Sequence, residues 1–270
     1  MITVSIVTYT KNPFLDKYDP KYQILSKSIE FISKSSLITE ILIIDNSKNK
    51  YFSDLEGISS KVVYKHMNGL NLGYGSGHNL ARKYIRLKKY HLILNPDIIF
   101  YENNCLDYLY EYMNNNPDIS MSQPLIFSYP NKKVQRLCKS NPTFFAQFIR
   151  LFLPRFLNKN NFLKRYNDAY EMRSVAYRNM VVESEYLSGC FMFCRVEHLN
   201  KVNWFDKRYF MYLEDADLTR MLSKIGKCVH IPLITIGHVW AKDSHTKFKL
   251  KIIAIYSFVL YSLKWGLKIF

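Results

Sequence analysis

The stretch YHLILNPD, Tyr90 to Asp97, is an apolar run that ends abruptly in an amide, a proline and a carboxylate. Three similar runs precede it: TVSIVTY at Thr3–Tyr9, EILIIDN at Glu40–Asn46 and KVVYKH at Lys61–His66. Near-continuous apolarity in such short runs predicts strands of a sheet that is covered on both faces. Helix-length segments lie around them, at about Lys21–Ser35, Gly77–Lys88 and Asn103–Asn115. The order β-α-β-β-α-β-α predicts an α/β fold with a largely parallel central sheet flanked by helices.

The composition indicates a folded, strongly basic protein. The 270 residues include 38 Lys and Arg against 22 Asp and Glu, a formal net charge of +16. A hydrophobic content of 48%, with 21 Tyr and 18 Phe, excludes a disordered polyelectrolyte. The basic residues lie mainly in Lys132–Arg178 and at the C-terminus, mixed with Phe, Leu and Trp. That mixture favours a membrane surface as partner over nucleic acid, the other partner that the charge suggests.

The cysteines and the two ends of the chain predict a cytoplasmic location. Five cysteines, an odd number without paired metal spacing, are typical of reduced core residues. The first residues, MITVSIVTYT, lack the basic start and the cleavage site of a signal peptide. The longest apolar stretch near the C-terminus, Ile252–Leu263, is too short to span a bilayer. We therefore expect a cytoplasmic protein that is peripheral on the inner face of the cytoplasmic membrane.

The chain divides into one large domain and a C-terminal helix. Residues 128–185 are basic, aromatic and interrupted by prolines, and their weak periodicity indicates an insertion or lid. Two strands are expected after it, around Lys227–Ile231 and Leu233–Trp240. We expect a domain over residues 1–245 and an amphipathic helix over residues 246–270. That helix is predicted to lie in the membrane interface; the alternative is a helix packed on the core or in a dimer interface.

Ligands of such sheets bind beyond the carboxyl ends of the strands, and polar residues gather there. The candidates are Thr8, Tyr9, Asp45, Asn46, Asn95 and Asp97. The glycine-rich stretch NGLNLGYGSGHN, Asn68–Asn79, fits neither a dinucleotide fingerprint nor a P-loop, because its glycines are spaced G-x-G-x-G and no G-K-[ST] follows. It is either a plain turn or a loop whose amides approach a phosphate.

Two further residues have metal-ligand chemistry. Asp97 follows Pro96 at the end of a predicted strand, where its carboxylate suits Mg²⁺ or Mn²⁺ carrying a diphosphate, or forms an Asx-type turn. His238, in ITIGHVW, ends the last apolar run and is either a packed histidine or a metal ligand.

The stretch FDKRYFMYLEDADLTRML, Phe205 to Leu222, places three carboxylates at the start of an amphipathic helix pattern: Glu214, Asp215 and Asp217. Carboxylates there are often caps in a favourable helix dipole. Three together repel one another, however, and such repulsion raises a carboxyl pKa toward the range of a general base.

With these residues assembled, the chain resembles the family 2 inverting glycosyltransferases of the GT-A fold, especially the bacterial rhamnosyltransferase-like branch of surface-polysaccharide synthesis. Six motifs carry the resemblance in the family's order: VSIVTYT, EILIIDNS, NLGYGSGHN, LNPD, FDKRYFMYLEDADLTRML and IGHVW. They extend from Ile2 to about His245. The resemblance implies a GT-A nucleotide-diphospho-sugar transferase fold.

The resemblance also implies roles for the candidate residues. The nucleobase and ribose pocket would be lined by Thr8, Tyr9 and Asp45, and the sugar-diphosphate would be bordered by Asn71, Gly73 and Asn79. Asn95 and Asp97 stand where the family has its Asp-x-Asp metal motif; since the first Asp is Asn here, Asp97 would depend on His238 as a further ligand. Asp215 matches the family's general base, and Glu214 and Asp217 would orient the acceptor, set the charge on Asp215 or support the helix start.

The implied reaction is a single displacement that inverts the anomeric carbon of the donor sugar. The donor would be a dTDP- or UDP-type nucleotide sugar held with Mn²⁺ or Mg²⁺, and the acceptor would be a hydroxyl of a growing lipid-linked glycan, such as O-antigen or lipopolysaccharide. The alternatives are a nucleotidyltransferase of similar fold and a basic nucleic-acid-binding module. The nucleotidyltransferase would need a Gly- and Lys/Arg-rich loop after the first strand, where TYTKNPFLD has one Lys and no Gly. The buried strands and the acidic centre argue against a nucleic-acid-binding module.

Overall fold

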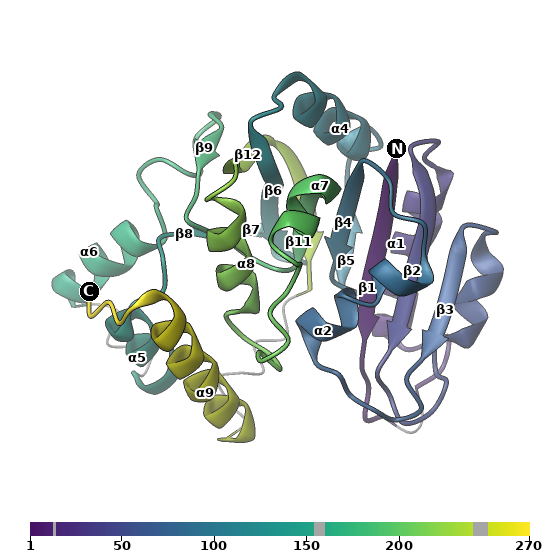
Figure 1. Ribbon diagram of the computed structural model, residues 1–270, viewed down its shortest axis with the longest axis horizontal. Coiled ribbons are helices and arrows are strands. Elements are labelled where there is room, and N and C mark those ends of the chain that lie inside the picture. Colours follow the sequence, from purple (N-terminus) through teal and green to yellow (C-terminus); the bar gives the residue numbers. More distant parts are fainter. Residues whose placement is uncertain (13–14, 154–159, 240–247) are drawn as a thin grey trace.

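The computed structural model describes residues 1–12, 15–153, 160–239 and 248–270. Within these ranges a ten-stranded sheet runs through the molecule in the order β3-β2-β1-β4-β11-β6-β12-β5, with β7 beside β6 and β9 beside β12 (Figure 1). Its strands are β1 (Ile2–Thr8), β2 (Ile38–Asp45), β3 (Val62–His66), β4 (Tyr90–Leu94), β5 (Ile98–Phe100), β6 (Ile119–Ser128), β7 (Lys133–Val134), β9 (Val182–Glu183), β11 (Phe191–Arg195) and β12 (Lys227–His238). A separate small sheet pairs β8 (Cys138–Lys139) with β10 (Tyr186–Leu187).

Helices cover the sheet and extend beyond one end of it (Figure 1). They are α1 (Pro20–Lys34), α2 (Tyr74–His78), α3 (Ala81–Tyr84), α4 (Cys105–Asn115), α5 (Phe144–Phe152), α6 (Asn161–Tyr170), α7 (Val196–Lys201), α8 (Glu214–Leu222) and α9 (Phe248–Trp265), with a 3₁₀ turn, η1, at Ser53–Ile58. Strands β3, β2, β1 and β4 are mutually parallel, as are β6 and β12, whereas β11 runs antiparallel between β4 and β6. The predicted α/β fold with a largely parallel, helix-flanked sheet is confirmed.

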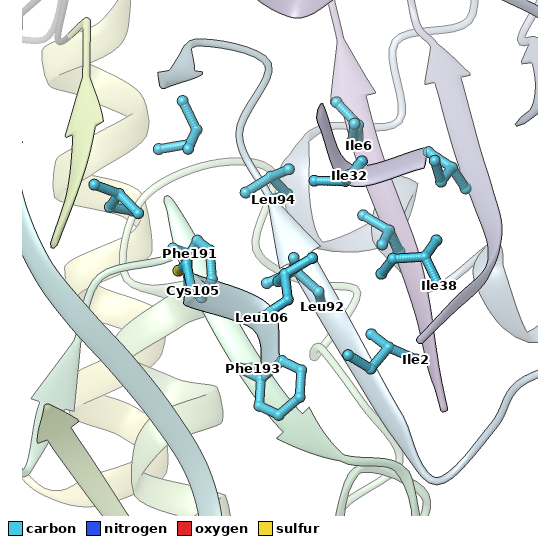
Figure 2. Packing of buried hydrophobic residues seen from close by; sticks show 14 of the residues in the cluster. Ile2, Ile6, Ile32, Ile38, Leu92, Leu94, Cys105, Leu106, Phe191 and Phe193 are labelled. Carbon is cyan, nitrogen blue, oxygen red and sulfur yellow. The ribbon is translucent and has the colours of Figure 1, made fainter. Parts of the chain in front are cut away.

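Alternate residues of the central strands pack on opposite faces of the sheet, which explains why the strands are apolar throughout. In β2, Ile41 and Ile43 belong to the core cluster that includes α1 and α4, whereas Leu42 and Ile44 belong to the cluster that includes α3, α7 and α8. Figure 2 shows the first cluster, where Leu92 and Leu94 of β4 meet side chains of α1 and α4. Both faces of the sheet are therefore covered.

Three predicted elements differ in extent. The helix expected over Gly77–Lys88 is instead two short helices, α2 and α3. A Cβ on Gly75 or Gly77 would lie 2.8 Å from Phe205 or 2.7 Å from Val7, so this segment is pressed too closely on its neighbours for ordinary side chains. The two strands expected after Lys227 form one strand, β12, whose pairing with β6 shifts between Ile231 and Thr235. Pro232 lies at that shift, and since proline has no N–H, it cannot donate a hydrogen bond to the neighbouring strand there.

The C-terminal helix packs on the domain with one face only. Tyr261 of α9 is fully buried in a small cluster with Leu213 and Ala216 at the start of α8. The carbonyls of Lys268 and Ile269 accept hydrogen bonds from the first two N–H groups of α5, so that α5 and α9 lie side by side (Figure 1). None of the helices in the described ranges has the length and apolarity needed to cross a bilayer. The expected boundary at residue 245 lies outside the described residues.

Candidate active site

The pairing of β5 with β12 brings Asp97 to His238. Strand β4 ends at Leu94, and after the turn through Asn95 and Asp97 the chain enters β5, at the far side of the sheet. In the antiparallel register His238 is opposite Ile98. The Nε2 atom of His238 consequently lies 3.2 Å from Oδ1 of Asp97 and 3.4 Å from the amide nitrogen of Asn95. The two candidate metal ligands and Asn95 thus form one cluster.

The tautomer of His238 follows from its contact with Gln135. The side-chain nitrogen of Gln135 donates to the backbone carbonyl of His238 at 3.0 Å, so its oxygen faces Nδ1 of the ring at 2.9 Å. Nδ1 must therefore carry a hydrogen, and in the neutral ring Nε2 presents a lone pair toward Asp97. This lone pair faces Oδ1 of Asp97, which is buried and accepts no hydrogen bond from the described residues.

A divalent cation between Asp97 and His238 would satisfy both electron-rich atoms. An imidazole whose other nitrogen is fixed by a hydrogen bond is the usual state of a histidine ligand. The described residues contain no cluster of three His, Cys, Asp or Glu that could hold a metal by themselves. Mn²⁺ or Mg²⁺ on two protein ligands takes its remaining ligands from phosphate oxygens and water, so the residues present fit such an ion in the presence of a diphosphate.

The ends of β1 and β2 carry the residues predicted to bind the nucleoside. Thr8 is buried, and Asp45 is fully buried with Ser47 N–H donating to Oδ1 at 2.9 Å and the Tyr64 hydroxyl donating to Oδ2 at 2.7 Å. Burial, followed by this hydrogen bond, raises the pKa of Tyr64 above its ordinary range. Tyr9 is 49% exposed. The structure places all three predicted residues at one edge of the sheet, while their contact with a nucleotide stays a prediction.

The glycine-rich loop is held by its own polar side chains. Asn71 accepts a hydrogen bond from the Gly73 N–H at 3.0 Å, and Gly73 has φ = 81°. A Cβ there would lie 2.1 Å from the Phe210 carbonyl, so only glycine fits. The Asn79 side chain donates to the Phe205 carbonyl at 2.9 Å and accepts from its N–H at 3.1 Å. Asn79 therefore connects this loop to the segment before α8. Its contact with the sugar-diphosphate of the donor stays a prediction.

Asp215 lies at the first turn of α8 with its carboxylate held in one orientation. Oδ2 accepts hydrogen bonds from the Gly189 N–H at 2.9 Å and the Tyr186 hydroxyl at 3.3 Å, and Oδ1 accepts one from the Ala216 N–H at 2.9 Å. The Tyr74 hydroxyl donates to the Gly189 carbonyl and so connects α2 to the same point. These contacts fix the carboxylate where α8 begins, at the wall of a cleft.

Glu214, next to Asp215, is a buried acid. Its side chain is almost fully buried, and its Oε2 has no hydrogen-bond partner among the described residues. Burial, and then the charge of Asp215, raises the pKa of Glu214 to about 8, against the opposing charge of Arg150. Glu214 therefore favours its protonated form at neutral pH. The role of Asp215 as the general base stays a prediction.

Asp217 faces away from the other two carboxylates. It is fully buried and accepts hydrogen bonds from Lys264 Nζ at 2.8 Å and Trp265 Nε1 at 2.6 Å. Both partners belong to the last turn of α9. Of the three roles considered for Asp217, the contacts match support of the helix start, since its side chain attaches α9 to α8.

A cleft of about 810 Å³ is lined by three of the predicted site residues, Glu214, Asp215 and His238. Asp97 adjoins it through His238, whereas the residues predicted to bind the nucleoside and the sugar-diphosphate are not part of its lining. Residues that sequence reasoning missed also line it: Gln135, Lys139, Arg150, Tyr186 and Tyr212. Gln135, Lys139 and Arg150 belong to the segment 128–185, which was expected only to be an insertion or lid. That segment contributes α5, α6 and strands that pair with β6, β10 and β12.

Two curated proteins are similar to nearly the whole chain, although no protein-family profile matches it. Rhamnosyltransferase WbbL of Escherichia coli (strain K12) is 26% identical over 237 residues, which are 83% of this chain and 81% of that protein. N-acetylglucosaminyl-diphospho-decaprenol L-rhamnosyltransferase of Mycobacterium tuberculosis (strain ATCC 25618 / H37Rv) is 25% identical over 264 residues, or 88% of this chain and 76% of that protein. The resemblance to rhamnosyltransferase-like family 2 glycosyltransferases is confirmed.

Solved glycosyltransferase structures share the fold. GalNAc-T7 with UDP, GalNAc and Mn²⁺ superposes on 88% of this chain with a TM-score of 0.62 and 13% identity. A mannosyltransferase of Pyrobaculum calidifontis in complex with GDP-Man and Mn²⁺ gives a TM-score of 0.55 over 88% of the chain, with 11% identity. This chain spans 43% and 56% of those two structures, respectively. The fold is therefore that of the GT-A glycosyltransferases, with a C-terminal helix.

Proposed function

We propose that this protein is an inverting glycosyltransferase that moves a sugar of the rhamnose class from a dTDP- or UDP-type donor to a hydroxyl of a lipid-linked bacterial surface glycan. One observation carries the proposal: a single cleft on a GT-A sheet is bordered by the fixed carboxylate of Asp215 and by His238, which lies against Asp97. The relatives' names supply the sugar and the lipid-linked acceptor. The UDP bound in GalNAc-T7 and the GDP-Man bound in the Pyrobaculum mannosyltransferase support a nucleotide-diphosphate sugar as donor.

In the proposed reaction Asp215 removes the proton of the acceptor hydroxyl as that oxygen attacks the anomeric carbon of the donor sugar. The Gly189 N–H and the Tyr186 hydroxyl hold the carboxylate in position, so little reorientation is needed when it accepts the proton. A divalent ion bound at Asp97 and His238 would offset the negative charge of the departing nucleoside diphosphate. Because the reaction is a single displacement, it inverts the configuration of the anomeric carbon.

A surface formed by α5 and α9 supports a peripheral position on the membrane. Its exposed apolar side chains, here called the α5–α9 surface, are Phe144, Phe148, Phe152, Ile252, Ile255, Tyr256, Val259 and Leu263. The rings of Phe144 and Phe258, 6.4 Å apart, join the two helices. Lys249 and Lys251 of α9 place positive charge beside these residues. Apolar side chains with neighbouring lysines suit the headgroup region of an anionic membrane, where a lipid-linked acceptor would be found.

The proposal is tested by a donor screen followed by a transfer assay. The thermal midpoint of the purified chain is measured with dTDP-, UDP- and GDP-sugars, each with and without Mn²⁺. Binding of the right donor should raise the midpoint, and the same donor should then transfer its sugar to a lipid-linked acceptor with inverted configuration. If no nucleotide sugar stabilises the protein or donates its sugar, the proposed function is wrong.

A further inference from the structure

Arg150 of α5 reaches the cleft and forms no ion pair with the residues that the structure describes. Its Nε and one of its terminal nitrogens, Nη2, are buried and have no hydrogen-bond partner among the residues that the structure describes. The guanidinium lies over the ring of Tyr212, 5.5 Å from its centre. Buried guanidinium nitrogens normally have acceptors, because leaving them unpaired costs free energy. The unpaired nitrogens therefore point to an acceptor that is not among the described residues.

Lys139 of β8 is the second cation in the same cleft. Its ammonium group lies 5.2 Å from the centre of the Tyr186 ring and forms no ion pair within the described ranges. Burial, and then the charge of Arg150, lowers the pKa of Lys139, whereas Asp215 acts in the opposite direction. Arg150 and Lys139 are thus close enough to repel each other, and an anion that contacts both would relieve this repulsion.

Two other cations of the cleft have partners. Arg173 pairs with Asp168 and Glu171, and Arg136 lies 3.8 Å from Glu171. Lys133, a further cation of the cleft, is exposed to solvent. Arg150 and Lys139 are distinguished because they are partly buried and have no ion-pair partner among the described residues. Both come from the segment between β6 and β10 rather than from the ends of β1 and β2. Arg150 provides several N–H donors in a fixed plane, and Lys139 provides a point charge, which is a combination that suits phosphate oxygens.

We propose that Arg150 and Lys139 bind the phosphate group that links the acceptor sugar to its lipid. This inference rests on the proposed glycosyltransferase function and specifies the chemical class of its acceptor as a sugar phosphate or diphosphate. Helix α5 connects the two parts of such a molecule: Arg150 lines the cleft beside Asp215, while Phe144, Phe148 and Phe152 belong to the α5–α9 surface. The lipid would lie at that surface, the phosphate at Arg150 and Lys139, and the sugar hydroxyl at Asp215.

The first test measures the affinity of the full chain for inorganic pyrophosphate by calorimetry, with EDTA present so that no metal-bridged donor mode contributes. Arg150→Gln and Lys139→Gln should each weaken binding by about tenfold or more, because each removes one charge from a desolvated contact. Arg150→Lys should retain most of the affinity. Arg136→Gln is the matched control in the same cleft and should change the affinity less than about twofold, since its charge is half-exposed and paired.

The second test separates the acceptor phosphate from the diphosphate of the donor. Arg150→Gln should leave the affinity for the donor nucleotide nearly unchanged, whereas Asp97→Asn should weaken nucleotide binding with metal and spare pyrophosphate binding without it. Turnover should favour an alkyl-diphosphate-linked sugar over the same sugar on an alkyl chain without phosphate, and Arg150→Gln should remove most of this preference. Near-UV circular dichroism checks that each variant is folded.

Three results would overturn the inference: no pyrophosphate binding by the folded wild type, equal binding by Arg150→Gln, or an equal loss of donor affinity in Arg150→Gln. The last would assign the cations to the donor diphosphate. Failure of the proposed function looks different, because then no nucleotide sugar would bind or react while pyrophosphate affinity would still depend on Arg150. The anion site would remain in that case, and its assignment to a glycan acceptor would fall.

Discussion

The Nε2 atom of His238 lies 3.2 Å from Oδ1 of Asp97, and the hydrogen of this imidazole is on the opposite nitrogen, bonded to Gln135. Two electron-rich atoms therefore face each other at the end of the sheet. A proton or a cation between these two atoms would stabilise the arrangement. The side-chain nitrogen of Asn95 lies 3.4 Å from Nε2, which is too long for a strong hydrogen bond to it. This contact leads to the first prediction.

Removal of divalent metal should abolish most transfer activity, and Mn²⁺ or Mg²⁺ should restore it. Gln135→Leu should raise the metal concentration needed for half-maximal activity by about ten- to a hundredfold, because it frees the His238 ring without removing a ligand. The measurement is transfer rate against free Mn²⁺ after EDTA treatment. Full activity of metal-free enzyme would contradict the prediction and would mean that Asn95, in place of the first aspartate, marks a metal-independent enzyme.

Asp215→Asn should lower turnover by at least about a hundredfold while leaving donor affinity nearly intact, since the amide keeps the shape but accepts no proton. Single-turnover rates and donor titrations provide the two measurements. Asp118→Asn is a suitable control, because Asp118 is an exposed carboxylate paired with Lys227. Near-normal turnover of Asp215→Asn would exclude this residue as the base.

Ionisation of Glu214 should lower the transfer rate at alkaline pH. Its pKa is raised to about 8, so it carries a proton at pH 7 and loses it as the pH rises through that value. The new charge would stand beside Asp215 and repel the donor diphosphate, so the transfer rate should fall above about pH 8. Glu214→Gln mimics the protonated acid and should keep most of the rate at pH 7 while lacking this fall. Identical pH profiles of the two proteins would refute the assignment.

His91 should make the fold sensitive to acid. It is fully buried, contacts the hydroxyls of Thr3 and Ser5 at 2.9 and 2.8 Å, and burial lowers its pKa to about 3. The unfolded chain binds the proton near pH 6.5, so stability is highest above that value and falls as the pH decreases toward 3. The contribution of His91 to the free energy of unfolding should fall by up to about 1.4 kcal/mol for each pH unit between 6.5 and 3.

Urea denaturation of wild type and His91→Asn between pH 7 and 4 tests this expectation. The variant should be less stable at pH 7, where it loses the packing and hydrogen bonds of the ring, but its stability should depend less on pH. A slope as steep as that of the wild type would show that other buried groups, such as His78, account for the acid sensitivity.

The order of β1, α1, β2, β3, β4 and α4 could be predicted from the sequence because each of these strands carries its own apolar pattern, which the two core clusters explain. Strand β6, which pairs with β11 and β12 within the sheet, was not predicted. The position of Asp217 could not be predicted either. Two residues along a helix turn the side chain by about 200°, so Asp217 points away from Asp215 although both lie in one short motif. Its partners, Lys264 and Trp265, come from α9, and no local sequence pattern predicts a contact between segments so far apart in the chain.

The residues around Asp215 escaped prediction for a related reason. Arg150 and Lys139 lie in a basic segment with weak periodicity, where nothing in the sequence separates a charge facing a cleft from one facing solvent. Gln135 likewise acts only through its contact with His238, a hundred residues and more away in the chain. Motif order thus located the carboxylates and the histidine, whereas the groups that hold or neutralise them required the fold.

The α5–α9 surface should hold the protein on anionic membranes. The full chain is expected to float with anionic vesicles and to be released by salt, since both apolar side chains and lysines contribute. Ile252 and Val259 of α9 are 52% and 48% exposed, so replacing both with Gln removes apolar contact with lipid while leaving the buried Tyr261 and the Lys264–Asp217 pair in place. If each partly exposed side chain contributes about 1 kcal/mol, the double variant should bind vesicles at least about tenfold more weakly.

Leu233→Gln, at an equally exposed residue of β12, is the control and should float like the wild type. Equal flotation of the double variant would exclude α9 from the membrane contact and leave the basic region Lys132–Arg178, which includes α5, as the contact, because that region contains the other cluster of cations mixed with aromatic residues.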